Sequence, residues 1–217
     1  MAYTLILGNK NLSSWSLRPY LALRATGAKF DEVIVRLDQP ETRAKIRNHS
    51  PAGKLPILKI VEGGRSVTVW DSLAICETLA ERHPDAKLWP DDPATRATAR
   101  SFAAEMHSGF PDVRDQLTMN FSRQLAAPVL REATRAQVTR IVEAWSGALA
   151  NYGKDGGFLF GGFSIADCMY APVVSRFITY GVAVPHVIDA YCERMMALPA
   201  MQDWAAAARL ETEAGWK

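Results

Sequence analysis

Three serine hydroxyls lie within four residues, 13–16 (Ser-Ser-Trp-Ser), where an apolar run gives way to a helical pattern. The run at residues 4–7 is typical of a buried strand, and helical spacing of apolar residues begins at Leu17. The first N–H groups of a helix have no intrahelical partner and carry partial positive charge, so hydroxyls placed there can help to bind an anion. A serine that simply caps the helix is the plainer interpretation. These residues alone leave both readings open.

The elements that must position these serines alternate between strand and helix over the first 82 residues. The spacing of apolar residues and the turn signals Gly27, Gly53 and Gly63-Gly64 separate them. We predict strands at 4–7, 32–37, 57–61 and 67–70 and helices from Leu17, over 41–48 and over 71–82. A strand, helix, strand unit favours a parallel pair joined by a right-handed crossover. The order is β-α-β-α-β-β-α on a small mixed sheet.

Beyond His83 the strand patterns end. The segment 84–93 contains three prolines and three aspartates, and we interpret it as a linker between a domain at 1–83 and an all-helical domain at 94–217. The spacing predicts one long helix over 94–119, a second through 138–149 and a third over 164–180. Two shorter helices begin at Pro185 and Pro199, because proline is tolerated in a first turn.

Composition narrows the class of protein. With 217 residues, 48% apolar and 22% charged, the chain can bury a core of ordinary size. A net charge of +2 without a basic stripe predicts neither a nucleic-acid nor a membrane partner. The sequence shows no signal-peptide pattern, and we expect a cytoplasmic protein.

The cysteines and histidines show no metal-ligand or disulfide pattern. Cys76, Cys168 and Cys192 each lie in an apolar helical pattern, which predicts buried, reduced thiols. The four histidines are too dispersed to show ligand spacing, so we infer no metal.

Four stretches, taken in order and spacing, resemble the soluble glutathione S-transferases. Residues 13–18 resemble the S-S-C-S-x-R motif of the zeta class, 50–56 its N-P-x-G-K-V-P loop, 71–75 the [E/Q/D]-S-x-A-I start of a helix, and 161–167 the G-x-x-S-x-A-D motif. The resemblance covers nearly the whole chain. It implies an α/β thioredoxin-like N-terminal domain (βαβ-α-ββα), an all-α C-terminal domain and glutathione as co-substrate.

The resemblance also implies residues that bind glutathione. The Leu55-Pro56 bond would be cis and would present the backbone of Leu55 to the cysteinyl group, whereas a generic proline here would open an edge strand in trans. Lys54, otherwise a solvated loop lysine, would reach the glycyl carboxylate. Ser72 would bind the γ-glutamyl carboxylate and Asp71 its ammonium group, although this pair also reads as a helix cap. We expect Asp71 to gain its partner only with the ligand.

Ser164 and Asp167 fit a capping box, in which each residue bonds the other's backbone. We therefore assign both residues to folding and not to chemistry.

The alignment of residues 13–18 with the family motif favours Ser13 as the catalytic residue, with Ser14 as the fallback. Arg18 lies five residues after Ser13, as the family's arginine lies after its catalytic residue. The hydroxyl would donate to the glutathione sulfur and favour the nucleophilic thiolate. Lowering a thiol pKa by roughly two units takes about 2.7 kcal/mol. A hydrogen bond to a charged group supplies about 1.5–3 kcal/mol and a helix N-terminus about 0.3–1 more, so the two together suffice.

Two departures argue against a zeta isomerase and against thiol-disulfide chemistry. Trp15 stands where the zeta motif has cysteine, and Thr179 stands where zeta enzymes carry an arginine, with Arg176 one turn earlier. No cysteine lies near Ser13, unlike in the omega and beta classes.

A second-substrate pocket would lie beside Ser13. Its apolar wall would also serve as ordinary core, and Arg114 would be the nearest candidate for an anionic substituent. The candidate lining residues are Leu12, Trp15, Met106, Phe110, Arg114 and Met119.

These observations predict a homodimeric transferase that activates glutathione for attack on a small hydrophobic electrophile. Two alternatives are a zeta-like glutathione-dependent isomerase and a non-catalytic binding or regulatory module of the same fold.

Overall fold

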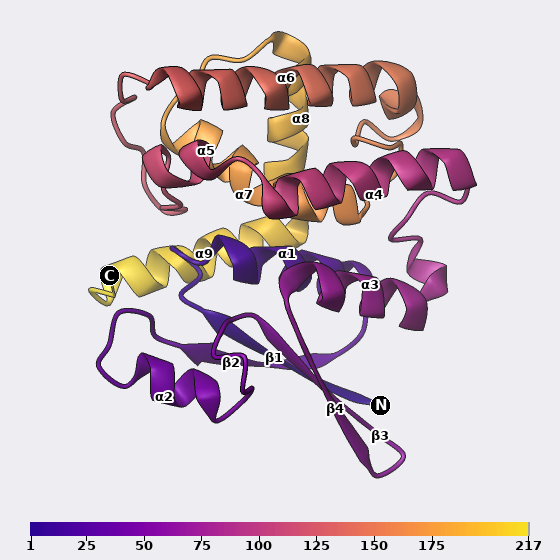
Figure 1. Cartoon of the computed structure of the whole chain (residues 1–217), viewed down its shortest axis with the longest axis vertical. Helices are drawn as coiled ribbons and strands as arrows, with labels where there is room; N and C mark the ends of the chain where they lie inside the picture. Colours follow the sequence, from indigo (N-terminus) through magenta and orange to yellow (C-terminus); the bar gives the residue numbers. More distant parts are fainter. Residues whose placement is uncertain (217) are drawn as a thin grey trace.

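The N-terminal domain is a four-stranded mixed sheet with helices on both faces (Figure 1). The computed structural model describes residues 1–216, and of Asp155 the backbone alone. The elements of the domain follow the predicted order: β1 (Ala2–Gly8), α1 (Ser14–Ala25), β2 (Phe30–Val35), α2 (Thr42–Arg47), β3 (Ile57–Glu62), β4 (Arg65–Trp70) and α3 (Ser72–Arg82).

The sheet order is β2-β1-β3-β4, with β1 parallel to β2 and antiparallel to β3, and β3 antiparallel to β4. Gly63 and Gly64, both at positive φ, form the β3–β4 turn, as a two-residue hairpin requires. β2 begins and ends two residues earlier than predicted, so Leu37 lies beyond the strand.

Alternating side chains of β1 fill two separate cores. Leu5 and Leu7 point toward α1 and α3 and join the large core, while Ile6 packs with Val35 and Ile46 under α2 on the other face. Because β1 is central and covered on both faces, its sequence is apolar throughout rather than alternating.

The second domain is entirely helical over the residues described and stacks on α1 and α3 (Figure 1). A 3₁₀ turn (Pro84–Ala86) occupies the predicted linker. The helices that follow are α4 (Pro93–Ser108), α5 (Pro111–Gln116), α6 (Glu132–Tyr152), α7 (Ile165–Thr179), α8 (His186–Ala197) and α9 (Pro199–Glu213), with a second 3₁₀ turn at Gly153–Asp155.

The single helix predicted over 94–119 is wrong, because the chain breaks between α4 and α5. Phe110 has a left-handed backbone (φ 59°) and precedes Pro111, whose ring disfavours helical geometry in the residue before it and which has no N–H to donate. The break turns α5 away from the axis of α4 and brings Arg114 back toward the end of α4.

The three cysteines are free and buried, as predicted. Burial raises the pKa of the Cys76 thiol, which lies inside α3. None of the helices found in residues 1–216 combines the length and apolar character needed to cross a membrane.

Candidate active site

A cavity of about 720 Å³ lies between the thioredoxin-like domain and the end of α4, and it gathers most of the predicted site residues. Its lining consists of Ser13, Trp15, Leu37, Ile46, Ala52, Lys54, Leu55, Pro56, Trp70, Asp71, Ser72 and His107. Ser14, the fallback for Ser13, is buried and is not among them. Three stretches far apart in the sequence therefore meet at one hollow.

Ser13 is the residue that precedes α1, but its side chain does not cap the helix. Its hydroxyl donates instead to Ser16 Oγ at 2.7 Å, and Ser16 Oγ also accepts the Gly8 backbone N–H at 3.0 Å. Simple capping by a serine side chain is therefore not what these residues do. The N-terminus of α1 lies beside the cavity, where its partial positive charge favours an anion.

The loop before Ser13 is fixed by the C-terminal helix α9. The carboxylate of Glu211 accepts the backbone N–H groups of Lys10 (2.8 Å) and Asn11 (2.9 Å), and Trp204 Nε1 donates to the Lys10 carbonyl at 2.8 Å. All three contacts are buried and span about 200 residues of sequence. Sequence reasoning missed them because no local pattern links residues so far apart.

The second stretch runs through the loop before β3. The Leu55-Pro56 peptide bond is cis, as the resemblance predicted, and Gly53 has a positive φ of 63°. Pro56 is buried while Lys54 is exposed at the rim of the cavity.

The third stretch is the start of α3, where Asp71 already has partners. Asp71 has φ 76°, and its Oδ1 accepts the backbone N–H groups of Leu73 (2.9 Å) and Ala74 (3.2 Å). Its Oδ2 lies 3.2 Å from His107 Nε2. The expectation that Asp71 finds a partner only with the ligand is therefore wrong. Ser72 differs, since its buried hydroxyl has no hydrogen-bond partner among residues 1–216.

His107, at the end of α4, is a lining residue that sequence reasoning missed. Burial lowers its pKa, the neighbouring Asp71 raises it, and the guanidiniums of Arg18 and Arg114 lower it again. Its Nε2 faces the Asp71 carboxylate across the mouth of the cavity, at the 3.2 Å given above. The sequence does contain a pattern that indicates His107. The buried face of α4 consists of Ala99, Ala103 and Met106, and His107 lies at the border of that face.

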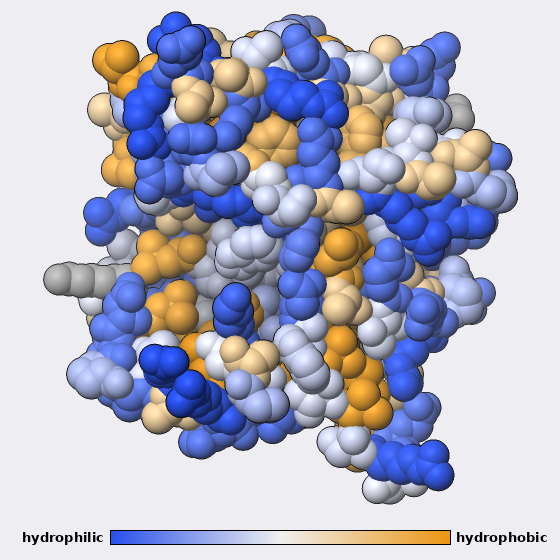
Figure 2. Space-filling view, viewed as in Figure 1, coloured by the Kyte–Doolittle hydropathy of each residue, from blue (hydrophilic) through white to orange (hydrophobic). Residues whose placement is uncertain are grey.

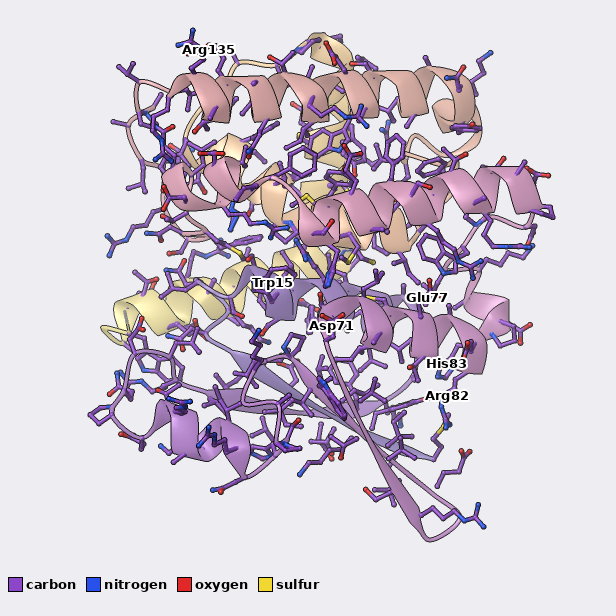
Figure 3. The ribbon with its side chains drawn as sticks, viewed as in Figure 1. Trp15, Asp71, Glu77, Arg82, His83 and Arg135 are labelled. Atoms are coloured by element: carbon purple, nitrogen blue, oxygen red, sulfur yellow. The ribbon has the colours of Figure 1, made fainter. Side chains whose placement is uncertain are left out.

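Trp15 lies beside this pair, between the two domains (Figure 3). Its ring meets the His107 ring edge-on, with centroids 5.4 Å apart. Of the residues proposed for the second-substrate pocket, Trp15 alone lines the cavity. Met106, Phe110 and Met119 are buried in the large core, Leu12 is half-buried, and Arg114 packs against the Trp15 ring. Their role in binding stays a prediction.

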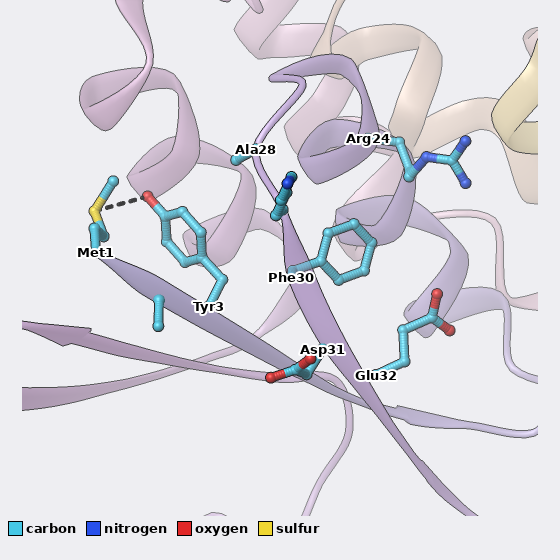
Figure 4. Close-up of a pocket in the computed structure, with 9 residues that line it drawn as sticks. Met1, Tyr3, Arg24, Ala28, Phe30, Asp31 and Glu32 are labelled. Atoms are coloured by element: carbon cyan, nitrogen blue, oxygen red, sulfur yellow. Dashed lines mark hydrogen bonds between the residues drawn. The ribbon is translucent and has the colours of Figure 1, made fainter.

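A second cavity, of about 670 Å³, lies at the opposite end of β1 and β2 (Figure 4). Its lining includes Tyr3, Arg24, Phe30 and Glu32. None of the predicted site residues lines this second cavity. Within the described chain no group of three or more His, Cys, Asp or Glu side chains is placed to hold a metal ion.

Two family models match the chain. The model of the glutathione S-transferase N-terminal domain matches residues 12–82, and that of the C-terminal domain matches residues 128–207. The chain belongs to the glutathione S-transferase family.

Curated relatives of this glutathione S-transferase family member carry different names. A probable maleylacetoacetate isomerase of Caenorhabditis elegans is 38% identical over 96 residues, which cover 44% of this chain and 42% of that protein. Glutathione S-transferase omega-1 of Mus musculus is 27% identical over 139 residues, covering 64% and 55%. The matches thus span about half the length of these relatives.

Solved structures of the family share the fold over nearly the whole chain. A glutathione transferase homologue from Burkholderia, with bound glutathione, has a TM-score of 0.71 at 24% identity and covers 96% of this chain and 98% of its own. A maleylacetoacetate isomerase from Anaeromyxobacter dehalogenans, with glutathione in its active site, has a TM-score of 0.68 at 25% identity, covering 94% and 95%. FzlA from C. crescentus reaches 0.73 at 20% identity, covering 95% and 92%.

Proposed function

We propose that this glutathione S-transferase family member transfers glutathione to small hydrophobic electrophiles. The observation that carries the proposal is the single cavity in which Ser13, the Lys54–Pro56 loop and the Asp71-Ser72 pair meet. Its volume of about 720 Å³ suits a tripeptide with a small second substrate beside it.

Each end of glutathione has a complementary group in this cavity. The buried hydroxyl of Ser72, which lacks a partner among the described residues, would donate to the γ-glutamyl carboxylate at the positive end of α3. Asp71 would accept the ammonium group. The backbone of Leu55 would pair with the cysteinyl backbone as an added strand does, and Lys54 would reach the glycyl carboxylate.

Ser13 and the N-terminus of α1 would act on the sulfur of glutathione. The thiol proton leaves to solvent, and the Ser13 hydroxyl turns from Ser16 to donate to the thiolate. The thiolate then attacks the electrophilic carbon, a C–S bond forms, and the leaving group departs with the electron pair of its bond to carbon.

Calorimetric titration with glutathione, followed by turnover of 1-chloro-2,4-dinitrobenzene, tests the proposal. Binding with turnover supports transfer. Binding without turnover of any electrophile favours a non-catalytic module, and absence of binding contradicts every glutathione-dependent reading.

A glutathione-dependent isomerase is the second candidate, favoured by the 38% identity to the probable maleylacetoacetate isomerase. In that reaction the thiolate adds to a double bond, the resulting single bond rotates, and elimination returns the thiolate. Conversion of maleate to fumarate, with no net consumption of glutathione, would identify it. Thr179 weighs against a zeta-type site, because it is buried and its hydroxyl donates to the Asn120 carbonyl.

Asp71 serves both the helix and the ligand, so two substitutions separate its roles. Asparagine caps a helix about as well as aspartate, so Asp71→Asn should keep the melting temperature within a few degrees while weakening glutathione binding by roughly tenfold, since a charge-assisted bond contributes about 1.5–3 kcal/mol. Asp71→Ala should lower both. Calorimetry and thermal melts of the two variants give the answer, and unchanged affinity in Asp71→Asn would remove Asp71 from the ammonium site.

We also propose a homodimer, the usual assembly of the family. Apolar surface lies over the β3–β4 hairpin (Figure 2), where Val67 and Trp70 are about half exposed on the edge strand β4. Light scattering of wild type and Val67→Asp tests whether this strand contributes to the assembly.

A further inference from the structure

The turn between β1 and α1 ends on Ser13, and its own backbone closes only part of it. The Asn9 carbonyl accepts the backbone N–H groups of Leu12 (3.2 Å) and Ser13 (2.8 Å). As in the first turn of a helix, the two earlier N–H groups, those of Lys10 and Asn11, need acceptors from outside the turn. A buried N–H without an acceptor is costly. The shape of the turn therefore depends on the group that accepts these two.

Glu211 of α9 supplies both acceptors. Its Oε1 accepts the Lys10 N–H at 2.8 Å, and its Oε2 accepts the Asn11 N–H at 2.9 Å. All three residues are buried, and α9 packs along α1 (Figure 1). Because one carboxylate bonds two successive peptide units, it fixes the orientation of the turn as well as its position.

α9 also holds the far side of residue 10. Trp204 Nε1 donates to the Lys10 carbonyl at 2.8 Å, and the Trp204 ring packs against Tyr20 of α1 with centroids 4.9 Å apart. The Lys10 ammonium lies 5.3 Å from the Trp204 ring centroid and 2.5 Å from Glu32 Oε2. The N–H, the carbonyl and the side chain of Lys10 are thus all held, three residues before Ser13.

The Ser13 hydroxyl must leave its partner, Ser16 Oγ, to act on a bound sulfur. Once it has turned, the backbone of Ser13 sets the distance and angle from this hydroxyl to the sulfur. Hydrogen bonds weaken steeply as their angle closes, and a misplacement of about 1 Å can cost roughly 10²-fold in rate. A small shift of the turn is therefore enough to weaken the activation of the thiol.

We propose that Glu211 is a positioning residue for glutathione activation, which sets from α9 the turn that places the Ser13 hydroxyl against the sulfur. The inference rests on the proposed transferase function. It gives the C-terminal domain a part in the thiol chemistry of the N-terminal domain, although Glu211 does not line the cavity.

Glu211→Gln separates this role from an effect of charge. The amide keeps the shape of the side chain, but its NH₂ group replaces one accepting oxygen and faces a backbone N–H, donor against donor. Loss of a negative charge by itself would lower the pKa of a nearby thiol, because an anion disfavours the thiolate. Displacement of Ser13 would raise that pKa. The two explanations therefore predict shifts of opposite sign.

The pKa of the bound glutathione thiol, read from the ultraviolet absorbance of the thiolate, should rise in Glu211→Gln by roughly one unit, a tenfold loss of ionisation. Calorimetry should show glutathione affinity within about threefold of wild type, less than the loss of one hydrogen bond to a charged group. In a Ser13→Ala background the same substitution should leave the thiol pKa unchanged, because the hydroxyl that Glu211 positions is gone. A purely structural role for Glu211 would lower the melting temperature and leave the thiol pKa at its wild-type value.

Asp203→Asn is the matched control. Asp203 lies on the same helix, and its Oδ2 is 2.7 Å from Arg24 Nη2 at the other end of α1. The substitution makes the same change of charge and removes another contact of α9, so its thiol pKa should match wild type. Trp204→Phe removes the other α9 bond to the turn and should raise the thiol pKa as Glu211→Gln does. It replaces Glu211→Gln in the test if that variant does not fold.

An unchanged or lowered thiol pKa in the variant tested overturns the proposal. So does a rise that persists in the Ser13→Ala background, or an equal rise in Asp203→Asn, which would mean that any loosening of α9 has the same effect. Failure of the transferase proposal looks different. It would appear as absent glutathione binding in wild type, or as a thiol in Ser13→Ala that titrates like that of wild type.

Discussion

Ser13→Ala should lower the turnover of glutathione conjugation by roughly 10²-fold at neutral pH and leave glutathione affinity within about threefold. The hydroxyl contributes little to holding glutathione, because Leu55 and the two charged ends would do so. Its effect is on the thiol, whose pKa should rise in the variant by roughly one to two units, the equivalent of one charge-assisted hydrogen bond. Ultraviolet absorbance of the bound thiolate against pH measures the shift directly.

Ser14→Ala is the matched control, since Ser14 is equally buried but does not line the cavity. Its thiol titration should match that of the wild type. The opposite pattern, with the pKa raised in Ser14→Ala and unchanged in Ser13→Ala, would show that Ser14 is the reactive serine.

Much of the fold could be predicted from local pattern. The apolar run at residues 4–7 predicts a strand, and the structure has β1 there. The Gly63-Gly64 pair predicts a tight turn, and both glycines have the positive φ of such a turn. The long helix over 94–119 failed for a local reason too. The helical spacing of apolar residues continues across Gly109 and Phe110, so the prediction extended the helix past Pro111. Proline tends to break a helix, and the structure does break there.

The cavity could be predicted only through resemblance. Nothing in the types of Lys54, Pro56 or Asp71 brings them to Ser13, because their meeting depends on the sheet order β2-β1-β3-β4 and on a crossover helix. The motifs supplied that information. They did not supply His107 or Glu211, because the contacts of these two residues join domains across about 35 to 200 residues of sequence.

Three arginines show the same limit more sharply. Arg18, Arg114 and Arg176 lie on three helices and look like ordinary surface arginines of amphipathic patterns. Only the packing of α1 against α7, with the α4–α5 break beside them, buries two of these guanidiniums.

Asp167→Ala should destabilise the protein by about 3–5 kcal/mol, more than the loss of an ordinary helix cap at about 0.5–2 kcal/mol. Its fully buried carboxylate accepts the backbone N–H groups of Leu159 (3.1 Å) and Ser164 (2.9 Å), the Ser164 hydroxyl (3.0 Å) and the Tyr191 hydroxyl (3.1 Å). The predicted capping box is present, and two further donors join it. Each donor left unsatisfied in a buried site costs about 1–3 kcal/mol, less whatever relaxation recovers.

Asp92→Ala is the control for this loss, because Asp92 caps α4 at the surface, where its carboxylate accepts the backbone N–H and the hydroxyl of Thr95. Urea denaturation of both variants should show a much smaller loss for Asp92→Ala. Equal losses would mean that the donors around Asp167 find other partners, and that the buried network adds nothing to the cap.

The pH dependence of the Asp167→Ala loss distinguishes burial from hydrogen bonding as the dominant influence on this carboxyl. Burial raises the pKa of Asp167 to about 6, although its four donors act to lower it. A carboxyl whose folded pKa exceeds its unfolded value stabilises the fold below the unfolded value, near pH 4, and that contribution is lost as pH rises through 6. The cost of Asp167→Ala should therefore be larger at pH 4.5 than at pH 7.5, by about 2 kcal/mol. A smaller cost at pH 4.5 would show that the four donors outweigh desolvation, so that the buried carboxylate stabilises the fold as a charge.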